Sequence, residues 1–214
     1  MAHTPSAYAA RVRFDAATAT YLTGALTDDV TLEPVDRETW ERHNQALWDG
    51  ADDRHPAYDL RAVMTDDEQA AGMDLEALLP PTLTHRLLLR AGDKVIGAYW
   101  GHQESWQRYY MIYSVVRRDW QGRGVYTRLL RRVVAAATAA GFREIYSRHR
   151  ADNNAILVPK LKLGFAIAAM EVSPRFGLLV HLRHYPAAGL RQLAEHRVDG
   201  SHAAALRDRG LPVP

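Results

Sequence analysis

The stretch DWQGRGVYTRLL, residues 119–130, separates two runs of the chain that have different patterns. The run before it, residues 108–116, is rich in aromatic and β-branched residues, which predicts a strand. The run after it repeats apolar residues at helical spacing as far as Gly141, which predicts a helix that stops there. The break contains Gly122 and Gly124, so we expect a tight turn that leads from the strand into the helix.

A strand that enters a helix through a glycine turn directs several unpaired backbone N–H groups at one place. The helix dipole adds partial positive charge there, so phosphate is the natural ligand. Two familiar phosphate loops do not fit, because GxxxxGK followed by Ser or Thr is absent and the GxGxxG pattern meets Thr127 at its last position. An ATP-type or NAD-type site therefore has little support.

The remaining segments alternate between strand and helix patterns, and their order predicts a mixed α/β sheet. Pro159 stands inside the last helical stretch, so we expect that helix to start late, to kink or to break. The expected strands cover residues 30–35, 83–90, 95–102, 108–116, 143–149, 165–172 and 177–185, and the expected helices cover 36–48, 66–79, the stretch from the break to residue 140, and 152–164.

The length of 214 residues suits one domain with terminal extensions. We expect an N-terminal extension over residues 1–28 with room for one helix, a domain over 29–185, and a polar tail over 186–214 with a helix at 187–196. The sequence shows neither a signal-peptide pattern nor a membrane-spanning apolar run, so we predict a cytoplasmic protein. The absence of cysteine excludes disulfides, thiolate metal sites and a cysteine nucleophile.

The formal net charge is +2, from 27 basic and 25 acidic side chains, which does not indicate a nucleic-acid binder. Basic residues nevertheless gather between residues 117 and 132, where we expect any anionic partner. The helical part of this run is interpreted mainly as a solvated helix face. The histidines show no metal-ligand spacing, so we predict no metal. The arginines of the run are Arg117, Arg118, Arg123, Arg128, Arg131 and Arg132.

The segment VVRRDWQGRGVY resembles the acetyl-CoA loop of the GCN5-related N-acetyltransferases, the GNAT family. The motif of that loop is Q/R-x-x-G-x-G/A, five residues after a strand-terminal valine, and Val116 stands at the valine position. The resemblance implies that backbone N–H groups of the loop hold the CoA pyrophosphate. Tyr126 departs from the motif because it occupies the final glycine or alanine position. The motif residues here are Gln121, Gly122, Arg123, Gly124, Val125 and Tyr126.

A second segment, ADNNAILVPKLKLGF at residues 151–165, is similar to a later part of the same family, where an asparagine opens a helix that ends in a GF pair. Asn153 stands where the family places the asparagine near the pantetheine arm. The two segments together extend the resemblance over about residues 30–185.

The resemblance also implies how the site is built. It implies a GNAT-like mixed, splayed β-sheet flanked by helices, in which Ser114, Val115 and Val116 contact acetyl-CoA through their main chain. One of these main-chain groups would be an oxyanion donor. Many family members carry a glutamate on this strand, but here the strand contains no acid. We therefore assign Glu104 as the general base, on one strand face with His102 if the strand extends that far.

The usual proton donor of the family is also missing from its position in this sequence. Many members use a tyrosine four residues before the GF glycine, and Lys160 occupies that position here. His149, at the end of the strand expected over 143–149, should lie near the splay and is assigned as acid or base, with Tyr146 as a weaker candidate. Glu104 and His149 could instead be ordinary side chains at strand ends.

These features predict an acetyl-CoA-dependent N-acetyltransferase that transfers the acetyl group directly to an amine of a small molecule, peptide or protein. Without a cysteine to carry the acetyl group, we expect a ternary complex. The alternative is a non-catalytic acyl-CoA-binding or regulatory domain. The acceptor, the acyl-chain preference and the existence of a homodimer are left open. Acidic residues that would favour a cationic amine are Asp49, Asp52, Asp53, Asp66, Asp67 and Glu68.

Overall fold

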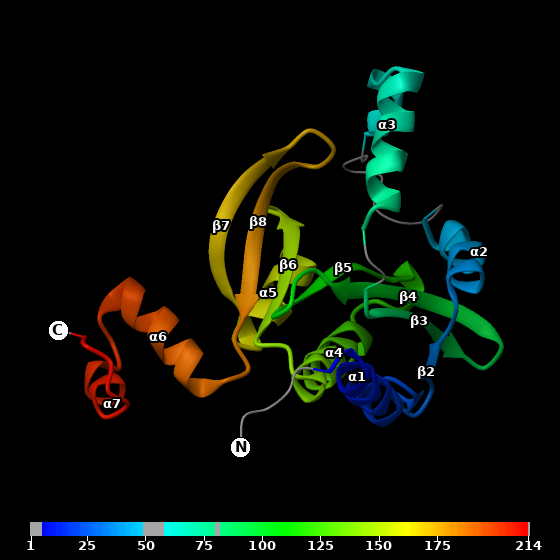
Figure 1. Ribbon diagram of the computed structural model, residues 1–214. Coiled ribbons are helices and arrows are strands. Elements are labelled where there is room, and N and C mark those ends of the chain that lie inside the picture. Colours follow the sequence, from blue (N-terminus) through cyan, green and yellow to red (C-terminus); the bar gives the residue numbers. More distant parts are fainter. Residues whose placement is uncertain (1–5, 49–57, 80–81, 214) are drawn as a thin grey trace.

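The computed structural model describes residues 6–48, 58–79 and 82–213, and one mixed β-sheet forms its centre (Figure 1). Its strands pair in the order β1-β2-β3-β4-β5-β6-β8-β7. This confirms the predicted mixed α/β fold, and the predicted strands form close to their expected bounds. The strands are β1 Gly24–Ala25, β2 Thr31–Pro34, β3 Thr84–Ala91, β4 Lys94–Gln103, β5 Arg108–Val116, β6 Glu144–Arg150, β7 Ala166–Ser173 and β8 Gly177–His184.

Helices lie on both faces of the sheet. Helices α1 and α4 pack together on one face, whereas α2 packs over β3 and β4 on the other (Figure 1). In Figure 1, α3 stands away from the sheet, and α6 and α7 project beyond the β7–β8 hairpin. Within the described ranges, no helix combines the length and the apolar character that a membrane span requires. The α-helices are α1 Ala7–Tyr21, α2 Arg37–Trp48, α3 Asp66–Ala77, α4 Val125–Ala140, α5 Asn154–Lys162, α6 Ala188–Asp199 and α7 Ala203–Arg207, and two short 3-10 helices cover Leu60–Val63 and Arg118–Trp120.

Helix α4 is positioned by its apolar side. Leu129, Val133 and Ala137 recur at helical spacing, and all three are buried against the sheet. Burial of one such leucine or valine side chain contributes about 1.5–3 kcal/mol, so this side holds the helix on the sheet. The helix ends at Gly141, whose φ of 100° suits the left-handed position that follows a helix. The sequence pattern therefore fixes both the direction of α4 and the place of its N-terminus.

Strands β5 and β6 run parallel and separate before either strand ends. They pair from Arg108 and Glu144 as far as Tyr110 and Tyr146, although both strands continue beyond this point. Against β4, the register skips Ile112, which forms a β-bulge just beyond the last β5–β6 pair. The ends of β5 and β6 therefore enclose a V-shaped opening, which we call the splay.

Side chains of β6 alternate between the two sides of the sheet at the splay, as the two-residue period of a strand requires. Ile145, Ser147 and His149 point to the side of α1, α4 and α5, which we call the helix-covered side. Tyr146 and Arg148 point to the opposite side, where they contact residues of β5, β7 and β8. We call this the open side.

Helix α1 belongs to the main core. Its Phe14 is buried, and so is Leu22 directly after the helix; both pack with residues of the sheet and of α4. The described part of the N-terminal segment, residues 6–28, therefore helps to bury the face on which α4 lies, although the division of the chain into extension, domain and tail stays a prediction. The tail contains α6 as expected, and also α7, which the sequence did not indicate.

The end of β4 and the course of α5 bear on two local predictions. Strand β4 ends at Gln103, so the condition under which Glu104 would share a strand face with His102 is not met. Glu104 lies in the turn before β5, where its N–H donates to the carbonyl of Arg108 at 2.9 Å. Helix α5 starts at Asn154 and continues through Pro159 without a break.

Candidate functional site

The N-terminus of α4 is open to an anionic ligand. Gly122 and Gly124 have φ values of 77° and 76°, which side chains disfavour, and Gly124 is the N-cap of the helix. Within the described residues, the N–H groups of residues 122–127 find no hydrogen-bond acceptor. A Cβ at either glycine would meet no atom within 4 Å, so no other part of the described chain covers the loop at these two positions. We call this arrangement the cradle; its N–H groups and the helix dipole favour phosphate.

The loop before the cradle is held by side-chain contacts. Nε2 of Gln121 donates to the carbonyl of Val116 at 2.9 Å, which ties the loop to the end of β5. The N–H of Gln121 donates within the preceding turn, so the unpaired N–H groups begin at Gly122. The guanidinium carbon of Arg123 lies 4.7 Å from the centre of the Trp120 ring, which keeps a positive charge beside the cradle.

The arginines of α4 have different surroundings. Arg132 donates to the carbonyl of Tyr21 at 3.1 Å and also to the carbonyl of Ala25, so it ties α4 to the segment after α1. Arg128 and Arg131 are exposed. The arginines of α4 therefore comprise a structural one, Arg132, and two that belong to an exposed helix face.

Three polar side chains end on the helix-covered side of the splay. Ser147 and His149 come from β6, and Lys160 comes from α5. The Ser147 hydroxyl and Nε2 of His149 are buried and have no hydrogen-bond partner among the described residues. Nζ of Lys160, a residue that is 1% exposed, lies 3.7 Å from the sulfur of Met111 and 5.1 Å from the ring centre of Phe165. Buried polar atoms without partners are rare, which indicates that a ligand can supply the missing hydrogen bonds.

Burial shifts the pKa values of the two titratable members of this cluster, Lys160 and His149. It lowers the pKa of Lys160 to about 7, because an ammonium is costly away from water. Burial also lowers the pKa of His149 well below its ordinary value, and the charge of Lys160 adds to the effect. At neutral pH, His149 is therefore an uncharged hydrogen-bonding group, and Lys160 can release a proton easily.

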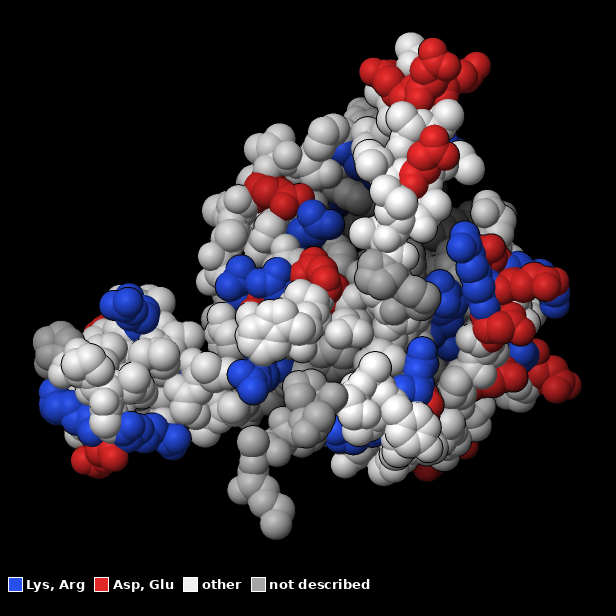
Figure 2. Space-filling view, viewed as in Figure 1, with Lys and Arg blue, Asp and Glu red and all other residues white. Residues whose placement is uncertain are grey.

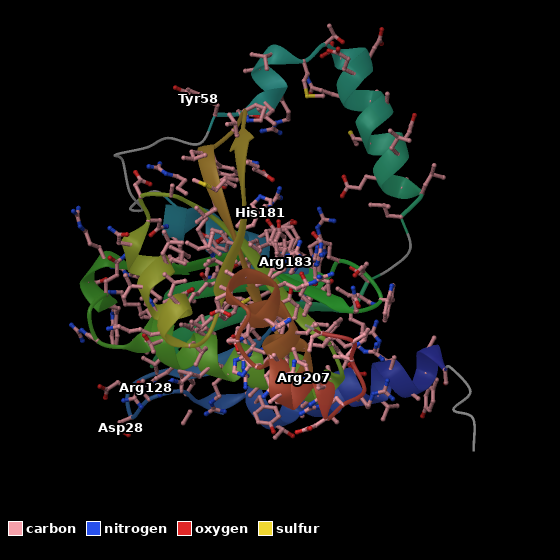
Figure 3. The ribbon with its side chains drawn as sticks, turned by 90° about the vertical axis from the view of Figure 1, so that its left-hand side faces the viewer. Asp28, Tyr58, Arg128, His181, Arg183 and Arg207 are labelled. Atoms are coloured by element: carbon pink, nitrogen blue, oxygen red, sulfur yellow. The ribbon has the colours of Figure 1, made fainter. Side chains whose placement is uncertain are left out.

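The open side carries a connected polar network. The Tyr146 hydroxyl lies 2.8 Å from Nδ1 of His181, and Nε2 of His181 lies 2.7 Å from a carboxylate oxygen of Glu171. Arg148 donates to the other oxygen of Glu171 and to the hydroxyl of Tyr110, both at 3.0 Å. Figure 3 marks His181 on β8 near the middle of the sheet, and Figure 2 shows basic and acidic side chains mixed between the β7–β8 hairpin and α3.

The structure does not bring the two predicted catalytic residues together. His149 lies on the helix-covered side, whereas Glu104 pairs with Arg108 and interacts electrostatically with Tyr146 on the open side. Arg108 donates a hydrogen bond to Glu104 at 2.9 Å and also lies 2.8 Å from Glu144. The carboxylate of Glu104, which we assigned as the base, is therefore engaged in an ion pair with this arginine. The histidine expected beside Glu104, His102, also faces the open side, since it pairs with Tyr110 across β4 and β5.

The predicted cofactor-binding residues lie at the end of β5, in the loop that leads into α4, and directly before α5. Ser114, Val115 and Val116 belong to β5 beyond its last pair with β6, so their outer edge faces the opening and not another strand. Asn153 is the N-cap residue of α5, and its side chain does not cap that helix. The hydroxyl of Tyr126 turns inward, and burial raises its pKa, so this departure from the motif packs into the protein without closing the cradle. The contacts of these residues with a ligand stay predictions.

Several polar residues of the site carried little signal in the sequence. The alternation in SRHR could have placed Ser147 and His149 on one side of β6. Nothing in the sequence linked Tyr146 to His181 and Glu171, which lie on two later strands. Of the acidic residues expected to attract a cationic amine, Asp49, Asp52 and Asp53 lie outside the described residues. The others, Asp66, Asp67 and Glu68, form the first turn of α3, which stands away from the sheet.

The chain is similar to known acetyltransferases. The sequence profile of the acetyltransferase (GNAT) family matches residues 35–165. No curated protein sequence matches the chain. Among solved structures, a GNAT family acetyltransferase from Elizabethkingia anophelis with acetyl-CoA bound has a TM-score of 0.51 at 15% identity, over 74% of this chain and 99% of that chain.

Two further structures have named substrates. A variant of spermidine N-acetyltransferase from Vibrio cholerae has a TM-score of 0.52 at 14% identity, over 74% of this chain and 95% of that chain. A ribosomal alpha-N-protein acetyltransferase in complex with coenzyme A has a TM-score of 0.55 at 12% identity, over 75% of this chain and 96% of that chain. At such identities the likeness shows the fold, whereas the profile match spans more than half of the chain. The chain therefore belongs to the acetyltransferase (GNAT) family.

Proposed function

We propose that the protein is a cytoplasmic, acetyl-CoA-dependent N-acetyltransferase that transfers the acetyl group directly to an amine. One observation carries this proposal. The cradle of unpaired N–H groups at the start of α4 and the unpartnered polar atoms of Ser147 and His149 lie on the same, helix-covered side of the splay. A ligand with a diphosphate at one end and a polar reactive group at the other would satisfy both.

Acetyl-CoA fits these residues. The N–H groups of residues 122–127 would hold its diphosphate, the free edge of residues 114–116 would hold its pantetheine arm, and the buried polar group would surround its thioester end. When bound, acetyl-CoA supplies an activated acyl thioester. Lys160 would return a proton to the sulfur that leaves, a role that its burial and its lowered pKa support.

The acceptor amine would approach from the open side, opposite the cofactor. Relatives with this fold include enzymes named for spermidine and for a ribosomal protein, so the fold accepts both small and macromolecular amines. The open side of this chain carries charges of both signs, which supports an amine acceptor without selecting one of these classes. We therefore propose an amine of a small molecule, peptide or protein.

The cradle can be tested by replacing Gly124 with valine and measuring coenzyme A binding by calorimetry. The side chain would stand in front of the unpaired N–H groups, so we expect binding at least about 20-fold weaker, or ~2 kcal/mol. Gly200→Val is the matched control, because Gly200 has a φ of 75°, also meets no atom within 4 Å, and ends α6 far from the cradle. Equal loss of binding in both variants, or none in Gly124→Val, would contradict the proposed cradle.

Turnover separates the enzyme from a binding domain. Thiol release from acetyl-CoA in the presence of a panel of amines is expected, and no acetyl label should stay on the denatured protein, because the chain has no cysteine to carry it. A covalent label would refute direct transfer. Tight coenzyme A binding without turnover of any amine would instead support the non-catalytic acyl-CoA-binding domain.

A further inference from the structure

The open-side network has the arrangement of a proton relay. A hydroxyl, an imidazole and a carboxylate follow one another, with 2.8 Å between the Tyr146 oxygen and Nδ1 of His181, and 2.7 Å between Nε2 of His181 and Glu171. A neutral imidazole has one N–H and one acceptor nitrogen. Nε2 lies within ion-pair distance of the carboxylate but forms no hydrogen bond with the described residues. A proton on Nε2 is the tautomer that the carboxylate favours, and with this tautomer Nδ1 accepts the proton of the Tyr146 hydroxyl.

The relay begins at the apex of the splay. Tyr146 and Tyr110 form the last pair between β5 and β6, and the strands separate directly after them. Ser147, the next residue, points to the helix-covered side and is fully buried. The Tyr146 hydroxyl and the proposed thioester end therefore lie on the two sides of the sheet at the place where it opens.

The outer members of the relay are accessible. The side chain of Glu171 is 33% exposed and that of His181 is 15% exposed, whereas Tyr146 as a whole is 6% exposed. Arg148 contacts Glu171 and Tyr110 and so holds the carboxylate in place. The relay can thus exchange protons with water at one end while its tyrosine end stays sheltered. The other titratable or charged groups around it are Glu104 of the β4–β5 turn, Arg108 and Tyr110 of β5, Glu144 and Arg148 of β6, and Arg183 of β8.

We propose that Tyr146, with His181 and Glu171 behind it, is the base that removes the proton from the acceptor amine. This rests on the proposed N-acetyltransferase function. As the bond between the amine nitrogen and the acetyl carbon forms and the carbon–sulfur bond breaks, the Tyr146 oxygen accepts the amine proton and passes its own proton to Nδ1 of His181. Glu171 stabilises the resulting imidazolium, and Lys160 gives a proton to the thiolate. His181 then loses its proton to water, and Lys160 regains one.

The relay explains why a tyrosine can act at this position. Burial raises the pKa of Tyr146 to about 12, so its phenolate is scarce at neutral pH. A tyrosine that gives its proton to a neighbouring histidine as it accepts another does not need to ionise first. Glu104, the base predicted from the sequence, is close enough to influence Tyr146 but is paired with Arg108. Tyr146 is thus the catalytic residue, and His181 and Glu171 are positioning residues.

The relay can first be tested without cofactor or substrate. Proton and nitrogen NMR of the His181 ring across pH reports which nitrogen carries the proton. We expect the proton on Nε2 in the neutral ring, and we expect Glu171→Leu, which removes the acceptor beside Nε2, to increase the share of rings that carry the proton on Nδ1. A proton on Nδ1 in the wild type, or a share of that tautomer that Glu171→Leu leaves unchanged, would overturn the relay whatever the enzyme's activity.

Kinetics then separate the relay from the proposed function. We expect Tyr146→Phe and His181→Asn to lower kcat at least about 100-fold, with an unchanged KM for acetyl-CoA. His181→Asn keeps an acceptor near Nδ1 but cannot take up a proton, so its loss of kcat should be as large as that of Tyr146→Phe. His184→Asn is the matched control on the same strand, where the ring contacts Phe165 and the carbonyl of Gly164. It should keep the wild-type kcat.

Two results would count against the proposal in different ways. If the wild-type protein turns over amines and both relay variants stay within about threefold of it, the relay is wrong and the N-acetyltransferase function stands. If the wild-type protein binds coenzyme A but acetylates no amine, both the function and the relay fail.

Discussion

The two sides of the splay differ in the contacts that their buried polar side chains make. On the helix-covered side, the Ser147 hydroxyl and Nε2 of His149 are buried without partners, and Lys160 contacts a sulfur and an aromatic ring. On the open side, the Tyr146 hydroxyl is hydrogen-bonded to Nδ1 of His181, and Nε2 of His181, although it too forms no hydrogen bond with the described residues, lies 2.7 Å from the carboxylate of Glu171. An unpartnered buried group costs stability and is retained where a ligand completes it, whereas a partnered chain can hold or move protons by itself. The difference indicates a cofactor side and an acceptor side.

The helix-covered side also contains a polar chain that is fully partnered. Oγ1 of Thr18 lies 2.8 Å from Nε2 of His85, whose Nδ1 lies 2.8 Å from the hydroxyl of Tyr109. The hydroxyl of Tyr99 lies 3.0 Å from that of Tyr109. Polar groups under the same helices therefore have partners where they serve the fold and lack them at the splay. Substitutions at the splay should change activity, and substitutions in this chain should change stability.

The largest effect is expected for Lys160→Met. Loss of the proton donor should lower kcat about 100- to 1000-fold in the thiol-release assay. The free energy of unfolding should stay the same or rise, because a methionine of similar shape needs no partner in the buried site. Lys162→Met, two residues further along α5 and exposed, is the control and should change neither quantity. A marked loss of stability in Lys160→Met, with activity retained, would assign Lys160 to the fold instead.

Gly101→Ala tests the partnered chain. A Cβ at Gly101 would lie 2.4 Å from the hydroxyl of Tyr99 and 2.5 Å from that of Tyr109, so one of these buried groups must move. We expect a loss of about 2–3 kcal/mol in the free energy of unfolding, measured by urea denaturation. Gly72→Ala is the matched control, because Gly72 lies within α3 and its Cβ would meet no atom within 4 Å. That variant should gain up to about 1 kcal/mol, and a Gly101→Ala protein as stable as the wild type would contradict the tight contact.

The effect of pH on stability is the smallest when it is taken per pH unit. Burial lowers the pKa of His85 to about 3, so the folded protein keeps this ring neutral below the pH at which an unfolded chain protonates it. The unfolded state therefore binds one more proton in this range, and stability falls as pH drops from about 6.5 toward 3, by up to about 1.4 kcal/mol per pH unit. Urea denaturation between pH 7 and pH 4 gives the free energy of unfolding at each pH. With falling pH, this free energy should decrease less steeply for His85→Gln than for the wild type. Equal slopes would show that His85 is not kept neutral by burial.

Much of the fold could be predicted because its signals are local. The aromatic and β-branched run of β5 and the apolar spacing of α4 define those elements without reference to distant residues. The glycine pattern between them also predicted where an anion would bind. The surroundings of Glu104 could not be predicted for the opposite reason, since the end of β4 depends on how its residues pair with β5 and not on their composition.

The sequence by itself determined the glycine turn into α4 and its unpaired N–H groups, because backbone geometry at Gly122 and Gly124 and the start of a helix are properties of neighbouring residues. Only the tertiary structure decided which polar side chains meet. Strand β8 lies between β6 and β7, and this pairing brings His181 and Glu171 to Tyr146 from strands far along the chain. No local pattern specifies such pairing, because it depends on how the whole sheet buries its apolar residues.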